Sequence, residues 1–204
     1  MDYKYDIFIS YRRLGDTRIW IETYFIPLLR NHLSQELGRD PAIFVDSLIE
    51  TGDSWPIILG EALSSSKVII PLWTKKYLES HWCTCEIGHM LERERKYGYR
   101  TTVNPNGLIF TTVIHDGETM PVQISTIQKI EMQEFFKLTL NKDGQRHTEF
   151  EDKVKLLVEK IARTIDSVPR WRKDWQIAAV NSFVTQLHSN MESIQTKIPK
   201  FSNL

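Results

Sequence analysis

The feature that most constrains this fold is a regular alternation between short apolar runs and longer stretches in which apolar residues recur at helical spacing. The short runs are rich in β-branched and aromatic residues, which is typical of buried strands. We expect strands at residues 6–11, 42–46, 67–73 and 108–114, and a short fifth strand between 124 and 130. Helices are expected at residues 19–37, 56–63, 77–97 and 150–165, with Gly38 ending the first.

Nearly continuous apolar strands that alternate with helices predict a parallel sheet with helices on both faces. The expected fold class is therefore α/β, with about five strands in the central sheet. In such sheets, binding sites form outside the carboxyl ends of the strands. One rim should carry residues 10–13, Asp46, Trp73 and residues 114–116, so we look for the site there.

The length predicts one domain and an appendage, because 204 residues with 41% hydrophobic content suffice for one core and are few for two. Pro169 ends the α/β pattern, which divides the chain into a domain at 1–168 and a helical extension at 169–204. From Trp171 to Met191, apolar residues recur every four positions, as in an amphipathic helix. It either docks on the domain's own surface or binds a partner or a second copy.

The charges balance, with 26 Lys and Arg against 26 Asp and Glu. No long-range field draws such a chain to nucleic acid or to a membrane surface, so neither is an expected partner. No apolar run approaches the roughly 20 residues that span a bilayer, and the polar start lacks the apolar segment of a secretory signal. We predict a cytoplasmic location.

The two cysteines lie in a string of potential metal ligands formed by His81, Cys83, Cys85 and His89. On a helix, residues two apart point in roughly opposite directions, so only Cys85 and His89 are expected to share a face. Two ligands do not make a structural zinc site, and we expect no bound metal.

Several nucleotide-dependent enzyme classes lack their signatures here. The turn after the first strand, residues 10–15, has no Gly-x-Gly-x-x-Gly, and no phosphate-loop motif occurs anywhere in the chain. A receiver domain with the same kind of sheet would need acidic residues after the first strand, where Arg12 and Arg13 stand instead. These absences leave few enzymatic uses of such a sheet.

Three segments in the correct order resemble the sequence boxes of Toll/interleukin-1 receptor (TIR) domains. Residues 5–12 are similar to the first box, and residues 44–46 with 52–55 to the second. Residues 80–86 carry the third, a Ser-x-Trp-Cys-x-x-Glu pattern that ends at Glu86. The resemblance covers about residues 5–166 and is strongest to bacterial TIR proteins that cleave NAD+.

This resemblance implies a flavodoxin-like TIR fold and Glu86 as the catalytic residue. It implies an NAD+ glycohydrolase or ADP-ribosyl cyclase that takes NAD+ as substrate and needs no resident cofactor. Bacterial relatives act in anti-phage immune signalling, so self-association through TIR domains or a partner defence protein is expected. Hydrolysis and cyclisation are both left open.

The role of Glu86 also follows from the chemistry of the bond. Nicotinamide leaves a cationic precursor as a neutral group, so no general acid is required, in contrast to glycosidases with two carboxylates. One carboxylate can hydrogen-bond the ribose hydroxyls and offset the positive charge that develops on the sugar. Trp82 lies one helical turn earlier and either walls the pocket or belongs to the core.

The expected substrate-binding residues surround Glu86. They are Ser10, Tyr11, Arg12, Asp46, Trp82 and Cys83. Two alternatives remain: Arg12 either meets pyrophosphate oxygens or pairs with a surface carboxylate, and Asp46 either contacts substrate or only caps a turn. The main rival function is a non-catalytic TIR scaffold, and nucleoside transfer at a similar bond is a third.

Overall fold

The computed structural model describes residues 2–172 except 14, 46–54, 118–119, 121–123, 125–126, 128, 138 and 142–143. Within these residues, five strands form one parallel sheet in the order β2-β1-β3-β4-β5. The strands are β1 Tyr5–Tyr11, β2 Ile43–Val45, β3 Ser66–Trp73, β4 Thr111–Val113 and β5 Lys129–Glu131. The prediction of a five-stranded parallel sheet is confirmed.

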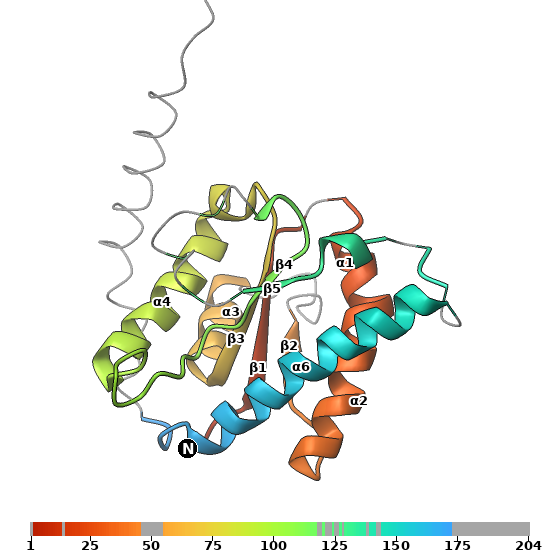
Figure 1. The fold of residues 1–204 in the computed structure, drawn as a ribbon. Coiled ribbons are helices and arrows are strands. Elements are labelled where there is room, and N and C mark those ends of the chain that lie inside the picture. The colour runs from red at the N-terminus through yellow and green to blue at the C-terminus, as the bar shows by residue number, and fades with distance from the viewer. Residues whose placement is uncertain are drawn as a thin grey trace, which may run out of the picture.

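Helices cover both faces of this sheet, as expected (Figure 1). One face carries α1 Thr17–Trp20, the π-helical turn η1 Ile21–Phe25, α2 Ile26–Leu37 and α6 Gln145–Ser167. The opposite face carries α3 Trp55–Ser64 and α4 His81–Tyr97. Gly38 ends α2 in the left-handed region with a φ of 64°, which a glycine adopts without steric cost.

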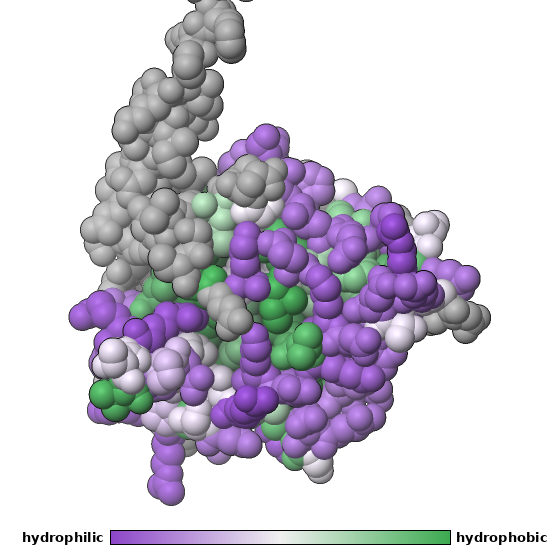
Figure 2. All heavy atoms as spheres, viewed as in Figure 1, coloured by the Kyte–Doolittle hydropathy of each residue, from purple (hydrophilic) through white to green (hydrophobic). Residues whose placement is uncertain are grey.

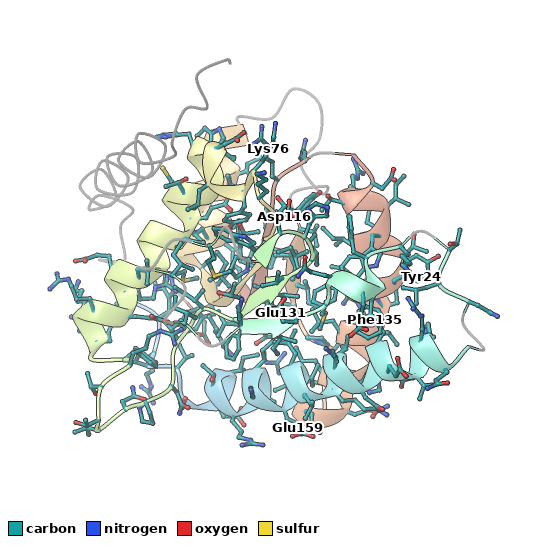
Figure 3. The ribbon with its side chains drawn as sticks, turned by 45° about the horizontal axis from the view of Figure 1, so that its top comes forward. Tyr24, Lys76, Asp116, Glu131, Phe135 and Glu159 are labelled. Atoms are coloured by element: carbon teal, nitrogen blue, oxygen red, sulfur yellow. The ribbon has the colours of Figure 1, made fainter. Side chains whose placement is uncertain are left out.

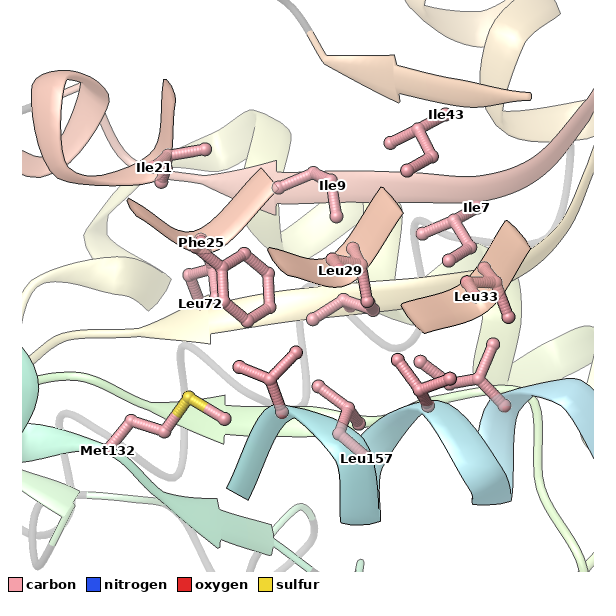
Figure 4. Close-up of a cluster of buried hydrophobic side chains, with 14 of the residues drawn as sticks. Ile7, Ile9, Ile21, Phe25, Leu29, Leu33, Ile43, Leu72, Met132 and Leu157 are labelled. Carbon is pink, nitrogen blue, oxygen red and sulfur yellow. The ribbon is translucent and has the colours of Figure 1, made fainter. Parts of the chain in front are cut away.

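Two buried clusters separate along β1 because successive side chains of a strand point to opposite faces. Ile7 and Ile9 join the cluster under α2 and α6, which Figure 4 shows in close-up. Phe8 joins the cluster under α4, together with Ile87 and Met90. The same alternation places Ser10 on the α4 side of the sheet.

The stretch from Tyr77 to Tyr97 is two elements and not the single helix that its periodicity predicts. A 3-10 turn, η3 Tyr77–Glu79, comes first, and Ser80 then takes an extended conformation with ψ 115°. The Ser80 hydroxyl accepts a hydrogen bond from the Cys83 amide at 3.4 Å, so Ser80 is the N-cap of α4. Ser80 therefore separates η3 from α4.

The fourth strand is shorter than predicted. Ile109 makes only an isolated bridge to Ile69, because Pro71 of β3 has no N–H to continue the ladder at Phe110. The amide groups of Leu108 and Ile109 donate to the Glu94 carboxylate. The short fifth strand, β5, includes two residues of the expected region and leads into the 3-10 turn η5 Gln133–Phe135. The last helix, α6, is longer than expected at both ends.

The end of the described chain lies against the first residues. Tyr3 donates a hydrogen bond from its hydroxyl to the Pro169 carbonyl at 2.8 Å, and the Trp171 indole donates to the Ser64 carbonyl at 3.2 Å. Residues 170–172 are not helical, so the expected helix does not begin at Arg170. The rest of that predicted helix lies outside the described residues.

Candidate active site

Glu86 lies in α4 and faces the carboxyl end of β1. Its side chain is buried, with 6% of the residue exposed, which is unusual for a glutamate. The Ser10 hydroxyl donates a hydrogen bond to Glu86 Oε2 across 76 residues of sequence. The strand therefore presents a hydroxyl to a carboxylate that the helix holds in a low-dielectric setting.

A third residue, Tyr77, completes this contact. Its hydroxyl forms a hydrogen bond with Ser10 Oγ, and its side chain is fully buried. A serine hydroxyl has one proton, which here goes to Glu86, so Ser10 must accept its other hydrogen bond. Tyr77 is therefore the donor: the Tyr77 hydroxyl donates a hydrogen bond to Ser10, and the Ser10 hydroxyl donates one to Glu86.

The surroundings keep Tyr77 in its protonated form. Burial, followed by the neighbouring Cys83 and Glu86, raises the pKa of Tyr77 well above its ordinary value of 10.0. Cys83 is itself buried in the cluster beneath α4. Tyr77 thus remains a hydrogen-bond donor across the physiological pH range.

Trp82 stands at the edge of this site. It is 37% exposed, whereas Glu86 one turn later is buried, so the tryptophan is not the core residue that its spacing allowed. The ring of His81 packs against it edge-on, with 6.1 Å between ring centroids. An exposed indole beside a buried carboxylate offers a flat apolar surface for stacking.

Arg12 pairs with a surface carboxylate, which was one of its two expected roles. Its Nη1 lies 2.7 Å from Glu79 Oε2 and donates to the Lys76 carbonyl at 2.7 Å. The hydrogen bond from Arg12 lowers the pKa of Glu79 below its ordinary value. These contacts join the end of β1 to the turn that carries Tyr77.

Of the remaining predicted site residues, Tyr11 lies on the opposite face of the sheet from Glu86, and Asp46 is not among the described residues. Tyr11 follows Ser10 in the strand and points to the opposite face, where it joins the cluster under α2 and α6. It therefore does not face Glu86. Asp46 lies outside the described residues. Lys76 and Asp116, labelled in Figure 3, lie at the rim expected from the sequence.

Tyr77 is the site residue that the sequence reasoning missed, whereas Trp73 was expected on this rim. Trp73 ends β3 and packs on Tyr77, with 5.5 Å between ring centroids. A buried tyrosine normally requires a partner for its hydroxyl, so a tyrosine just before the Ser-x-Trp-Cys box was the available signal. The prediction of one continuous helix concealed it.

The string of histidines and cysteines has other partners. Cys85 Sγ lies 3.6 Å from His81 Nε2, and His89 Nε2 lies 3.1 Å from Arg93 Nη2. The expectation that only Cys85 and His89 share a face is therefore wrong, because His81, four residues before Cys85, also belongs to α4. Burial and Arg93 lower the pKa of His89 to about 3. No potential metal ligands gather in groups of three within the described ranges.

Comparison with known proteins identifies the family. The family model described as "TIR domain" matches residues 7–142, which is most of the chain. The chain therefore belongs to the TIR domain family. Disease resistance protein RPP2B of Arabidopsis thaliana is 25% identical over 96 residues, which are 47% of this chain and 7% of that protein. The chain thus corresponds to a small part of that relative.

Two solved structures align with the chain. The TIR domain of the Toll-related receptor TRR-2 from Hydra magnipapillata is 14% identical with a TM-score of 0.46, over 73% of this chain and 98% of that one. The TIR domains of the activated Roq1 resistosome are 19% identical with a TM-score of 0.39, over 92% and 99% of the two chains. Among the helices described, none has the length and apolar character needed to cross a membrane.

Proposed function

We propose that this TIR domain is an NAD+ nucleosidase that cleaves the bond between nicotinamide and ribose. Its products are nicotinamide and either ADP-ribose or a cyclic isomer of ADP-ribose. Glu86 is the catalytic residue in this proposal, and NAD+ enters from the rim where β1 and β3 end. The enzyme needs no resident cofactor, because the leaving group of NAD+ is already activated by its positive charge.

The observation that carries the proposal is the buried carboxylate of Glu86 at this rim. Charge interactions are stronger in a poorly hydrated site than in water, so a carboxylate there stabilises a developing ribosyl cation effectively. The Ser10 hydroxyl fixes one carboxylate oxygen in place. A fixed carboxylate requires little reorganisation when the charge develops, which favours the transition state over the bound substrate.

The other predicted residues take narrower roles around Glu86. Trp82 supplies a partly exposed ring for stacking on a base, and Cys83 forms part of the buried wall. Ser10 positions Glu86, so a direct contact of Ser10 with ribose becomes secondary. Asp46 stays a proposed contact, since it lies beyond the part of the chain that the structure describes.

The biological setting belongs to the same proposal. We place the activity in bacterial anti-phage signalling, in the cytoplasm, with activation by self-association or by a partner defence protein. Family membership and the disease-resistance role in the name of the plant relative support an immune signalling role in general. The acceptor after bond cleavage, water or an adenine nitrogen, decides between hydrolysis and cyclisation.

The decisive experiment follows nicotinamide release from NAD+ by chromatography at several protein concentrations. We expect Glu86→Gln to lower the rate by about 10³-fold, because it removes the charge and keeps the shape of the side chain. Glu92→Gln is the matched control. Glu92 lies in the same helix and pairs with Arg95 outside the site, so this variant should keep the wild-type rate.

The same assay tests the scaffold alternative. If the wild type releases no nicotinamide even when crowding agents promote assembly, the enzyme proposal fails and the scaffold is favoured. Equal rates for the wild type and Glu86→Gln would also contradict it, because the carboxylate would then have no part in the reaction. The identity of the product peak separates hydrolysis from cyclisation.

A further inference from the structure

A second cavity lies away from the Glu86 site. Its volume is about 720 Å³, which is within the range of small-molecule binding sites. It is lined by the loop of residues 100–107, by the start of β4 and by α6, and it contains none of the residues around Glu86. Figure 2 shows apolar side chains in a hollow of this face with hydrophilic side chains on either side.

The cavity combines a basic rim with an apolar floor. Arg100, Lys160 and Arg163 line it, and no acidic residue is among its described lining residues. Arg163 is largely exposed and lies 3.5 Å from Glu159, and no ion pair within the described residues includes Lys160. The floor includes Phe110, which is partly exposed. A ligand with an anionic group and an attached ring would contact both, with its anion at the basic rim and its ring on the apolar floor.

The loop is constructed to hold Arg100 in position. Arg100 has a φ of 55°, a left-handed conformation that is uncommon outside glycine and that often marks functional positions. Its guanidinium packs against Gly107, where an added Cβ would lie 2.2 Å from Nη2. Nε and Nη2 bind Glu94, and Nη1 has no hydrogen bond within the described part of the chain.

Hydrogen bonds within the loop keep this arrangement ordered. The amide of Arg100 donates to the Asn106 carbonyl at 3.0 Å, and that of Thr101 donates to the Asn104 carbonyl at 2.9 Å. Gly98 begins the loop in the left-handed region and accepts a hydrogen bond from the Thr101 hydroxyl at 3.1 Å. A preformed cavity of this kind requires little ordering when a ligand binds.

We propose that this cavity is a binding site for a nucleotide. Its phosphate would lie between Lys160 and Arg163, with Arg100 Nη1 as a further donor. Its base would cover the apolar floor at Phe110, and the Asn106 amide would meet polar atoms of the base or ribose. The site lies at the amino end of β4, whereas Glu86 lies at the carboxyl end of β1, so the two ligands do not compete.

The test is a titration of the full chain with adenosine monophosphate, observed by amide NMR and calorimetry. We expect shifts in the signals of Gly107, Thr101 and the α6 residues near Lys160. Lys160→Glu should weaken the affinity by at least about tenfold, because it removes a charge-assisted hydrogen bond. Lys155→Glu makes the same charge change on α6 outside the cavity, and it should leave the affinity unchanged.

Three results would overturn the proposal. The first is an absence of shifts at millimolar nucleotide, and the second is a set of shifts confined to residues around Ser10 and Glu86. The third is an equal affinity for inorganic phosphate and for the nucleotide, because the apolar floor would then have no role. Arg163→Glu repeats the test if Lys160→Glu does not give a folded spectrum. None of these readouts depends on NAD+ cleavage.

Discussion

Buried carboxylates at the two ends of the sheet have different kinds of hydrogen-bond partners. At the amino end, Asp6 binds Arg39 at 2.7 Å and Lys67 at 3.0 Å, and Glu94 binds Arg100 at 2.6 Å. At the carboxyl end, Glu86 is also buried, and its Oε2 accepts a hydrogen bond from the neutral hydroxyl of Ser10. Cationic side chains hold the first two acids in ion pairs.

We infer from this difference that Asp6 and Glu94 stabilise the fold, whereas Glu86 takes part in the reaction. A carboxylate paired with a guanidinium has its charge compensated within the fold, and removing one member of such a pair destabilises the fold. The Glu86 carboxylate instead accepts a hydrogen bond from a neutral hydroxyl, at the rim where we propose that a cationic substrate arrives. Active sites commonly keep such unfavourable arrangements at a cost in stability.

The largest effect should come from Glu94. Glu94→Ala leaves Arg100 without its partner and the amides of Leu108 and Ile109 without an acceptor, so we expect a loss of about 3–5 kcal/mol in the free energy of unfolding. Urea denaturation at pH 7 measures it. Glu86→Gln should lose less than about 1 kcal/mol, and equal losses in the two variants would remove the distinction between the ends of the sheet.

Asp6 should give an intermediate effect that depends on pH. Burial alone would raise its pKa, but Arg39, the Ala42 amide and Lys67 outweigh burial and lower the pKa from 3.8 to about 2. The depressed pKa stabilises the fold above about 3.8, and this contribution is lost as the pH falls toward 2. Asp6→Asn should therefore cost about 2 kcal/mol at pH 7.

Denaturant titrations of this variant and the wild type at several pH values check the dependence. The difference in the free energy of unfolding between the wild type and Asp6→Asn should be constant near neutrality and shrink below pH 4. Asp40→Asn, an exposed neighbour, is the control and should change little at any pH. If the difference in the free energy of unfolding between wild type and Asp6→Asn grew as the pH fell, the stabilising role of ionised Asp6 would be contradicted.

The smallest effect should come from Tyr77. Tyr77→Phe removes the hydroxyl that donates to Ser10. Without this hydrogen bond, the Ser10 hydroxyl is held less firmly in the orientation that donates to Glu86. We expect kcat for NAD+ cleavage to fall by about tenfold with little change in KM, which matches the loss of one hydrogen bond. Tyr99→Phe removes a hydroxyl near the other end of α4 and should leave kcat unchanged. A rise in KM alone for Tyr77→Phe would point to substrate contact instead.

Periodicity and glycine positions were sufficient for much of the fold. Alternating apolar runs predicted the parallel sheet, and Gly38 marked the end of α2 because its left-handed conformation is local. The length of β4 was not predictable in this way. The Leu108 amide donates to the Glu94 carboxylate, 14 residues earlier, and Pro71 of β3 has no N–H to pair with Phe110, so the ladder is interrupted before Thr111.

The candidate site shows the same limit. The third box gave Glu86 and Trp82, but the Ser10 contact spans 76 residues and depends on how β1 and α4 pack. Tyr77 was hidden because Ser80 ends one element and caps the next, and helical periodicity does not register a cap between two helical turns. Arg12 had two open roles, and its ion pair with Glu79 corresponds to the structural one.

The hydrogen bond between Tyr3 and Pro169 has a consequence for protein engineering. It brings the beginning of β1 and the end of α6 side by side, as Figure 1 also shows. A short glycine-serine linker would therefore join residue 169 to residue 3 and give a circular permutant. New ends at the exposed tip near Val103 would then cut the loop of the second cavity and leave the strand and helix around Glu86 uncut.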